Sequence, residues 1–305
     1  MEHISVLLAE AINFLSPQAN QNFIDATLGG GGHAYEILKR TGPHGHLLGF
    51  DKDESAILRA KDKLKEFGAR FQVVNSSYSE LAEVADKIKP VAGIIFDLGF
   101  NSWQLQDGER GFSWQQPGAL DLRYDTKIGQ PAYELLNTLS VDELTQIFKD
   151  YGEEPQAKKI AKAIVEQRIS QKFYTTADLL TIISRVKSSG KRSLPPATLV
   201  WQALRIVVNH ELEELAETLP KALSLLASGG RIVVISFHSG EDRIAKDFFK
   251  IESRDCLCPP QFPKCICGHK ASLKIITPKP ITPESEELIN NPRSRSAKMR
   301  VAERI

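Results

Sequence analysis

Short apolar segments alternate with helix-like segments over the first hundred residues of the chain. The apolar segments have the length and the β-branched and aromatic content of buried strands, and they span residues 22–27, 46–51, 70–75 and 91–99. The helical pattern between them is clearest at residues 53–68. This alternation predicts an α/β fold with a parallel sheet. Such sheets bind ligands beyond the carboxyl ends of their strands, which is where Gly29–His33, Asp51 and Asp97 fall.

The alternation stops in the middle of the chain. Between residues 103 and 199 we find no convincing strand, but helical patterns at residues 141–152, 154–169 and 175–187. Pro155 suits a first helical turn, and Thr176 is a predicted N-cap. The sequence therefore predicts a first sheet part at residues 1–102, an inserted all-helical domain at residues 103–199 and a second sheet part at residues 200–305.

The second sheet part starts with a helical stretch and continues with strands. We expect the helix over residues 203–230 to be interrupted near Pro220. The segment 231–239 is a predicted buried strand, and the final strands are expected at residues 273–281 and 297–305.

Composition and charge exclude several classes of protein. The hydrophobic fraction of 42% and charged fraction of 25% are typical of a globular protein. A net charge of +1 predicts no global attraction to nucleic acid, so any basic surface must be local. The first residues lack the pattern of a signal peptide, and no apolar run is long enough to cross a membrane. All four cysteines lie between Cys256 and Cys267, unlike a spread-out disulfide framework, so we expect a reducing, cytoplasmic setting.

A run of glycines at residues 29–32 follows the first predicted strand. Gly29, Gly31 and Ala34 fit the pattern G-x-G-x-x-A of dinucleotide sites, and Asp51 follows about 20 residues later. Asp51 could accept hydrogen bonds from a ribose diol, which NAD and S-adenosylmethionine both carry. The pattern alone therefore leaves the ligand open.

Asp25 favours S-adenosylmethionine over NAD as the ligand. It lies just upstream of the glycine run, where a carboxylate would repel the pyrophosphate of a dinucleotide. The same carboxylate suits the sulfonium and ammonium groups of S-adenosylmethionine. Asp97, at the end of the fourth predicted strand, strengthens this preference.

The segment 97–125 is rich in polar and aromatic residues. Its polar candidates are Asp97, Asn101, Ser102 and Gln104, and its aromatic candidates are Phe100, Trp103, Phe112 and Trp114. Enzymes that modify a base unstack it and hold it against aromatic surfaces. Alternatively, these aromatic rings form the core at a hinge between the two domains.

A polar cluster ends the strand predicted at residues 231–239, namely Ser236, His238, Ser239, Glu241, Asp242 and Arg243. A lone His at a strand end is more often structural, but we expect this cluster at the same sheet edge as Asp51 and Asp97, which favours a substrate site for His238 and Asp242. Asp242 could instead cap the next helix and pair with Arg243. The basic runs at residues 185–192 and 291–300 are either phosphate contacts or solvated loops.

All four cysteines lie between Cys256 and Cys267. They could supply four thiolates to a tetrahedral ion. Because C-x-C pairs are less usual than C-x-x-C pairs in structural zinc sites, we favour reduced thiols in a Pro-rich loop and predict no metal site.

The chain resembles the bacterial small-subunit ribosomal RNA cytosine-N4 methyltransferases, the RsmH or MraW family. The resemblance covers nearly the whole chain in order. It rests on the motifs HISVLLAE, DATLGGGGH, DLGFNSWQLQDGERGFS, LDLRYD, YGEE, WQALRIVVNHEL, VVISFHSGEDRIAK and NPRSRSAKMRVAER. Many members of the family also have the Cys-Pro loop.

The resemblance implies a Rossmann-like S-adenosylmethionine-dependent methyltransferase fold with an inserted helical domain. It implies methylation of the exocyclic N4 amine of a cytidine near the decoding centre, in small-subunit (16S) ribosomal RNA or the small ribosomal subunit. The cofactor contacts implied by the motifs are Gly31, Gly32, His33, Asp51, Tyr78, Asp97 and Gln104.

Acceptors facing the cytosine amine would localise its lone pair. We expect this catalytic role for Asp97, Asn101 and Ser102, with His238 and Asp242 as further candidates. An NAD-linked oxidoreductase and a non-catalytic RNA-binding protein are the rival classes. The inserted domain could serve RNA binding, formation of a homodimer, or both.

The chain departs from the family pattern at a few positions around the predicted base pocket. The family usually has Pro at position 5, Ser-Ser at 101–102, Pro or a small residue at 103, Phe at 114 and Leu at 240. This chain has Ser5, Asn101-Ser102, Trp103, Trp114 and Gly240 there. The departures concern the choice of substrate and leave the predicted cofactor residues intact.

Overall fold

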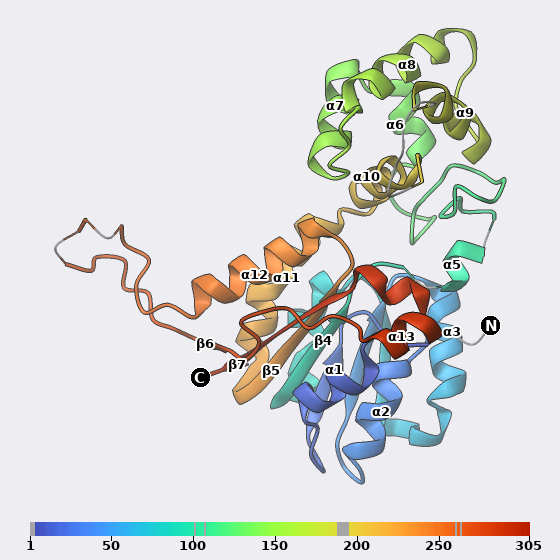
Figure 1. Ribbon diagram of the computed structural model, residues 1–305. Coiled ribbons are helices and arrows are strands. Elements are labelled where there is room, and N and C mark those ends of the chain that lie inside the picture. Colours follow the sequence, from blue (N-terminus) through green and yellow to red (C-terminus); the bar gives the residue numbers. More distant parts are fainter. Residues whose placement is uncertain (1–3, 101, 107, 188–194, 260, 263) are drawn as a thin grey trace. The chain divides into compact units, whose positions relative to one another are not determined.

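The computed structural model describes residues 4–100, 102–106, 108–187, 195–259, 261–262 and 264–305. The chain divides into two compact units. The sheet unit comprises Met1–Gly99 and Leu212–Ile305, and the helical unit comprises Phe100–Glu211. Figure 1 labels the elements of both units.

The sheet unit is built on a seven-stranded sheet with the order β3-β2-β1-β4-β5-β7-β6. The pairs formed among β1 to β5 are parallel, whereas β7 runs antiparallel to both β5 and β6. The predicted α/β fold class is confirmed, although the sheet is mixed and not wholly parallel. The strands are β1 (Asn22–Asp25), β2 (Leu47–Asp51), β3 (Phe71–Asn75), β4 (Val91–Asp97), β5 (Leu226–Ser236), β6 (Leu273–Ile275) and β7 (Lys298–Arg304).

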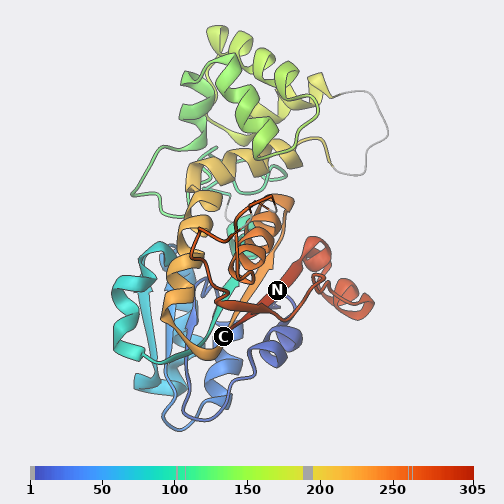
Figure 2. The same cartoon turned by 90° about the vertical axis from the view of Figure 1, so that its left-hand side faces the viewer.

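Helices cover both faces of this sheet (Figures 1 and 2). The α-helices are α1 (Leu8–Leu15), α2 (Gly32–Arg40), α3 (Glu54–Lys63), α4 (Leu81–Val84), α11 (Glu211–Leu225), α12 (Ser239–Glu252) and α13 (Ser285–Asn290). The 3₁₀ turns are η1 (Lys65–Arg70), η2 (Tyr78–Glu80), η3 (Ala85–Ile88) and η4 (Pro292–Ser296).

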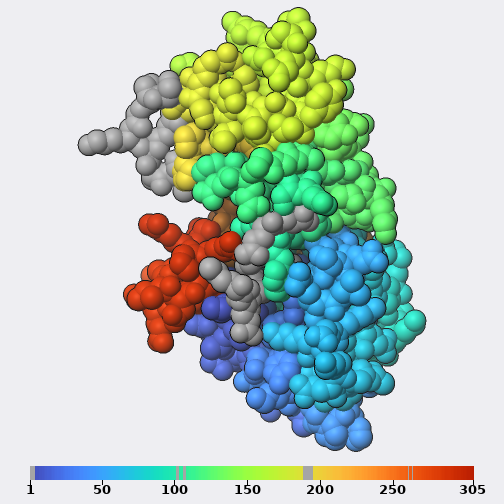
Figure 3. Space-filling model, turned by 90° about the vertical axis from the view of Figure 1, so that its right-hand side faces the viewer, coloured from blue at the N-terminus to red at the C-terminus, as the bar shows by residue number. Residues whose placement is uncertain are grey.

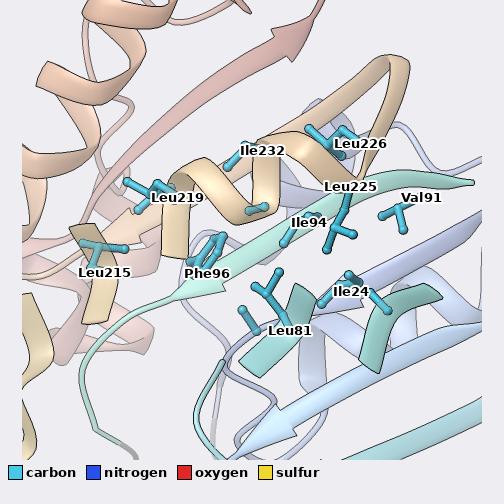
Figure 4. Packing of buried hydrophobic residues seen from close by; sticks show 14 of the residues in the cluster. Ile24, Leu81, Val91, Ile94, Phe96, Leu215, Leu219, Leu225, Leu226 and Ile232 are labelled. Atoms are coloured by element: carbon cyan, nitrogen blue, oxygen red, sulfur yellow. The ribbon is translucent and has the colours of Figure 1, made fainter. Parts of the chain in front are cut away.

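Successive residues of β4 enter different hydrophobic cores. Phe96 packs with Leu215 and Leu219 of α11 on one face (Figure 4). Ile95 belongs to the core on the other face, together with Ile37 of α2. Because side chains alternate along a strand, an uninterrupted apolar strand is what a sheet covered on both faces requires.

The strand order reverses between β1 and β4. From β1 the chain builds outward through β2 to β3, whereas β4 starts the other half of the sheet. Asp25 and Asp97 end these two adjacent strands. In open α/β sheets such a reversal opens a crevice at the carboxyl ends of the strands.

The helical unit has its own hydrophobic core. Its helices are α5 (Ser102–Gln106), α6 (Ala132–Thr138), α7 (Val141–Asp150), α8 (Ala157–Ser170), α9 (Thr176–Val186) and α10 (Thr198–Asn209). The described part of this unit contains no strand, only an isolated bridge between Ala119 and Thr175. The unit extends beyond residue 199, the boundary expected from the sequence, because Val200, Trp201 and Leu204 of α10 lie in its core.

Local helix signals are corrected at three positions. Thr175, not Thr176, caps α9. The Thr175 hydroxyl accepts a hydrogen bond from the Asp178 amide, and the Asp178 carboxylate accepts one from the Thr175 amide. Pro155 precedes α8 and does not lie in its first turn. Pro220 does not interrupt α11, since the residues around it stay packed in the core. The helical stretch is instead interrupted at His210, between α10 and α11, where φ is 54°.

Among the described residues, no helix is long and apolar enough to cross a membrane.

Candidate active site

The glycine loop turns the chain sharply from β1 into α2. Gly29 and Gly31 have φ values of 50° and 75°, a region that favours glycine. The Gly29 amide donates to Asp51 Oδ2 at 2.8 Å, and the Gly31 amide donates to the Leu28 carbonyl at 2.8 Å. Gly31 is the N-cap residue of α2, and no side chain among the described residues caps that end.

Neighbouring side chains approach the backbone closely at two of the predicted cofactor positions, both of them glycines. A Cβ on Gly32 would lie 1.9 Å from Ser5 Oγ, and a Cβ on Gly31 would lie 3.1 Å from a methyl of Leu64. Thus Ser5, one of the departures from the family pattern, sits directly against the glycine loop. Both glycines let neighbouring elements approach, and their contact with a cofactor stays a prediction.

Asp51 is held rigidly at the end of β2. Besides the bond from Gly29, its Oδ1 accepts from the Asp53 amide at 2.8 Å. Burial raises the pKa of Asp51 from 3.8 to about 6, and the backbone hydrogen bonds oppose that rise. A carboxylate oxygen can accept a second hydrogen bond, so Asp51 retains capacity for a ligand hydroxyl.

Asp25 and Asp97 form the acidic centre of the sheet edge. Asp25 is 2% exposed, and burial raises its pKa from 3.8 to about 7. The pKa of Asp97 is raised well above 3.8 by burial and then by the negative charges of Asp25, Glu241 and Glu287. Oδ1 of Asp97 is buried and has no hydrogen-bond partner among the described residues. Such an atom is costly unless something pairs with it.

His33 lies beside Asp97 in the first turn of α2. Its Nδ1 is 3.6 Å from Asp97 Oδ2, and its Nε2 is 3.2 Å from the Val6 carbonyl. Because a carbonyl only accepts, the Nε2 atom carries a proton in this contact. The structure therefore brings three predicted residues, His33, Asp51 and Asp97, to one edge of the sheet.

Tyr78 follows β3 in the turn η2, as the predicted cofactor role requires. Its ring packs edge-on against Phe96, with ring centroids 5.6 Å apart. Phe96 thus supports one edge of this contact, and the Tyr78 side chain stays partly exposed.

The end of β5 differs from the sequence-based interpretation. Glu241, not Asp242, closes the N-terminus of α12, because it accepts from the amides of Phe237 and His238. Asp242 binds Arg300 on β7, with Nε and Oδ1 2.5 Å apart. Nε2 of His238 is buried without a hydrogen-bond partner in the described part of the chain, although it lies 3.2 Å from Glu241 Oε1.

The remaining predicted residues belong to the helical unit. Asn101 lies outside the described residues, and only the backbone of Ser102 is described, in α5. Gln104, also in α5, is 4% exposed. Phe112 is buried in the core of the helical unit and stacks on Tyr124, which favours the structural interpretation for this ring.

Two residues at the sheet edge were not predicted from the sequence, and a third, Glu241, was predicted there without its capping role. The Thr27 hydroxyl accepts from the Asp97 amide at 2.5 Å, Glu287 accepts from the Leu7 amide at 2.9 Å, and Glu241 caps α12. The sequence does contain one relevant signal, because Glu241 stands three residues after the N-cap, as in a capping box. Glu287 comes from a distant helix and has no local signal.

Comparison with known proteins decides the family. A sequence model of the MraW methylase family matches residues 1–305. The ribosomal RNA small subunit methyltransferase H of Thermomicrobium roseum is 48% identical over 99% of this chain and 94% of that protein. A protein of the same name from Caldicellulosiruptor saccharolyticus is 47% identical over 100% of this chain and 99% of its own. The chain belongs to the MraW methylase family.

Membership of the MraW methylase family confirms the resemblance inferred from the sequence motifs. Among solved structures, an rRNA methylase from Streptococcus thermophilus is similar, with 11% identity and a TM-score of 0.46, over 100% of this chain and 99% of that one.

The acidic edge of this MraW-family chain predicts an unusual dependence of stability on pH. The pKa values of Asp25, Asp51 and Asp97 are raised, so the folded state holds more protons than the unfolded state from about pH 4 upward. Their contribution to stability is therefore complete in acid and is lost as pH rises through about 6 to 7.

We expect this contribution to show in the free energy of unfolding of the ligand-free protein, measured with urea between pH 5 and 8. The decline with pH should be shallower in an Asp25→Asn variant. Asp62→Asn, an exposed change of the same kind, should follow the parent curve. Identical slopes for Asp25→Asn and the parent would contradict the raised pKa of Asp25.

Proposed function

We propose that the chain transfers a methyl group from S-adenosylmethionine to the exocyclic N4 amine of a cytidine in small-subunit (16S) ribosomal RNA, near the decoding centre. The chain belongs to a family of methylases, and its relatives are named ribosomal RNA small subunit methyltransferases. The observation that carries the proposal is the acidic centre formed by Asp25 and Asp97, because it calls for a cationic ligand.

The residues present fit S-adenosylmethionine. Oδ1 of Asp97 is buried without a hydrogen-bond partner among the described residues, and three other carboxylates raise its pKa. A sulfonium or ammonium group would relieve both costs, since an opposite charge favours the ionised carboxylate. A pyrophosphate would add to the repulsion. The same observation therefore disfavours an NAD-linked oxidoreductase.

Other residues at the sheet edge would hold the remaining parts of the cofactor. Asp51 would accept from the ribose diol with the capacity left by its backbone hydrogen bonds, which include those from Gly29 and Asp53. Tyr78 would flank the adenine. Gly31, Gly32 and His33 would line the turn into α2, and Gln104 is a further contact that the family motifs imply.

The reaction asks mainly for positioning. The bound cofactor supplies an already activated methyl group, whereas the cytosine amine is a poor nucleophile because its lone pair is delocalised into the ring. Acceptors that face the amine N–H groups localise this pair and take up the charge that develops. We assign this role to Asp97, Asn101 and Ser102, with His238 as a further candidate.

Asp242 plays a different part in this proposal. Its carboxylate is shared between Arg300 and, at 3.7 Å, Lys298, and these cations lower its pKa. We therefore propose that Asp242 joins α12 to β7 and does not reach the substrate.

The RNA would be bound partly by exposed cations of η4. Arg293 and Arg295 are exposed, whereas Lys298 and Arg300 of the same basic run are engaged by Asp242. The segment lies on the surface of the sheet unit, red in Figure 3. Phosphate contacts from such residues position an RNA without reading its sequence. We propose a cytoplasmic location for the protein, because small ribosomal subunits are its proposed substrate.

Labelled methyl transfer tests the proposal. Small ribosomal subunits that lack the modification are incubated with the protein and labelled S-adenosylmethionine, and the product nucleoside is identified by mass. We expect N4-methylated cytidine. Label in another nucleoside would overturn the assignment of the base, and binding of NAD in place of S-adenosylmethionine would overturn the reaction. RNA binding without methyl transfer would favour the non-catalytic alternative.

A further inference from the structure

The segment between α12 and β6 projects from the sheet unit as a long loop (Figure 1). It covers residues 253–272. None of its described residues belongs to a hydrophobic core, and three apolar side chains are exposed, namely Leu257 (41%), Phe262 (48%) and Ile266 (76%). Burial of apolar surface therefore does not explain the conformation of this loop.

Four sulfur atoms converge within the loop. The Sγ atoms of Cys256, Cys258, Cys265 and Cys267 all lie within 4.8 Å of one another. The measured separations include 3.3 Å for Cys256 and Cys265, 3.6 Å for Cys265 and Cys267, and 3.9 Å for Cys256 and Cys267. In a tetrahedral site with Zn–S bonds of about 2.3 Å, two sulfurs are about 3.8 Å apart. The cluster has the dimensions of a single tetrahedral ion.

The backbone of the loop is arranged around these sulfurs. The loop has two C-x-C arms, and the middle residue of each arm donates its amide to a sulfur of the other arm. Leu257 donates to Cys267 at 3.3 Å, and Ile266 donates to Cys258 at 3.3 Å. Amide donors of this kind stabilise thiolates and orient metal ligands.

We propose that Cys256, Cys258, Cys265 and Cys267 bind one zinc ion as four thiolates. The C-x-C spacing led us to predict no metal site from the sequence. The structure removes that objection, because the two short arms face each other and each donates a backbone amide to a sulfur of the other arm. Soft thiolate ligands in tetrahedral geometry select zinc or iron over magnesium and calcium.

Two disulfides would not produce this arrangement. A disulfide joins two sulfurs at about 2.05 Å and leaves the two pairs distinct. Here Cys265 lies at comparable distances from Cys256 and Cys267. His269 is not needed as a ligand, since its Nε2 is 3.2 Å from the Ile251 carbonyl at the end of α12.

The ion has a structural role. A site closed by four protein ligands leaves no position for a substrate or water, unlike a catalytic zinc site. The ion joins the two arms of a loop that lacks a hydrophobic core, and its binding is coupled to the folding of that loop. It thereby holds the exposed apolar residues and the neighbouring cations Arg254, Lys264 and Lys270 in a defined arrangement.

Metal analysis of the full-length chain tests this proposal. The protein is expressed with zinc in the medium, purified without chelators and analysed by mass spectrometry for metals. We expect one zinc ion per chain and its loss in Cys258→Ser and Cys265→Ser variants. The control is Lys264→Ser, a change in the same loop that leaves the four thiolates intact and should keep the ion. Circular dichroism establishes that each variant retains the fold of the sheet and helices.

Two further measurements separate the alternatives. Cobalt added to the metal-free protein should produce the intense visible absorption of a tetrahedral tetrathiolate site, which Cys265→Ser should abolish. Trypsin should cleave the loop faster after removal of zinc. Purified protein that contains no zinc and has four reactive thiols would overturn the proposal. Protein that shows no reactive thiols after denaturation would also overturn it, because that result indicates disulfides. Iron in place of zinc would overturn the choice of ion. Because no readout depends on methyl transfer, the result is independent of the proposed function.

Discussion

Replacing Asp97 by Asn is expected to have opposite effects on cofactor binding and on stability. Loss of one member of a buried, hydrogen-bonded charge pair costs about 2 to 5 kcal/mol, so S-adenosylmethionine should bind at least about thirty-fold more weakly. The ligand-free protein should become more stable, because Asp97 is buried among like charges and its Oδ1 has no partner in the described chain. Groups strained for function often show this trade between activity and stability.

Isothermal titration and thermal unfolding measure the two effects on the same samples. Asp62→Asn is the matched control: its side chain is 81% exposed, and both its affinity and its melting temperature should equal those of the parent. An Asp97→Asn protein that bound the cofactor as tightly as the parent would refute the assignment of Asp97 to the cofactor site. Weak binding combined with lower stability would indicate that the fold, and not the site, had been damaged.

Replacing Gly111 by Ala is expected to destabilise the helical unit by about 2 to 5 kcal/mol. Gly111 has φ of 70°, which costs an Ala residue about 1 to 2 kcal/mol. In addition, the new Cβ would lie 2.1 Å from the Ala119 carbonyl oxygen, and overpacking of this kind costs about 1 to 3 kcal/mol. The shift required would also disturb the bond from Trp201 Nε1 to the Gly111 carbonyl.

Gly129→Ala isolates the effect of close packing. Gly129 has a similar φ of 74°, but nothing lies within 4 Å of an added Cβ, so only the conformational cost of about 1 to 2 kcal/mol remains. The three tryptophans all lie between residues 100 and 211, so their fluorescence during urea unfolding reports on this unit. Equal losses in the two variants would contradict the close approach of Gly111 and Ala119.

The strands and their order in the chain were predictable because burial on both faces leaves a clear apolar pattern. Each of the four strands predicted in the first hundred residues is present, within a few residues of its predicted ends. Helix boundaries were less predictable, since neighbouring residues compete for the same role. Thr175 and Thr176 are equally suitable caps by residue type, and the Asp178 side chain decides in favour of Thr175. Pro220 should weaken a helix, yet the packing of Leu219 and Ala222 maintains α11.

For the candidate site, too, some features were predictable from the sequence and others were not. The glycine run and the acids at strand ends identified Gly31, Asp51 and Asp97, because parallel strands bring their carboxyl ends to one edge. The partners of these residues were not identifiable: Thr27 and Glu287 contact the site only through the fold. Asp242 shows the same limit, since the sequence does not reveal that Arg300, 58 residues further along the chain, binds its carboxylate.

The sequence by itself determined the family, the α/β class and the acids that end the strands, because these depend on local pattern and on residue types. Only the tertiary structure decided which charges lie together and which are neutralised. Burial and proximity, not sequence, raise the pKa values of Asp25 and Asp97 and leave Asp97 Oδ1 unpaired within the described chain. The same is true of the four cysteines: their spacing argued against a metal, and the folding of two arms against each other brings their sulfurs to the distances of a tetrahedral ion.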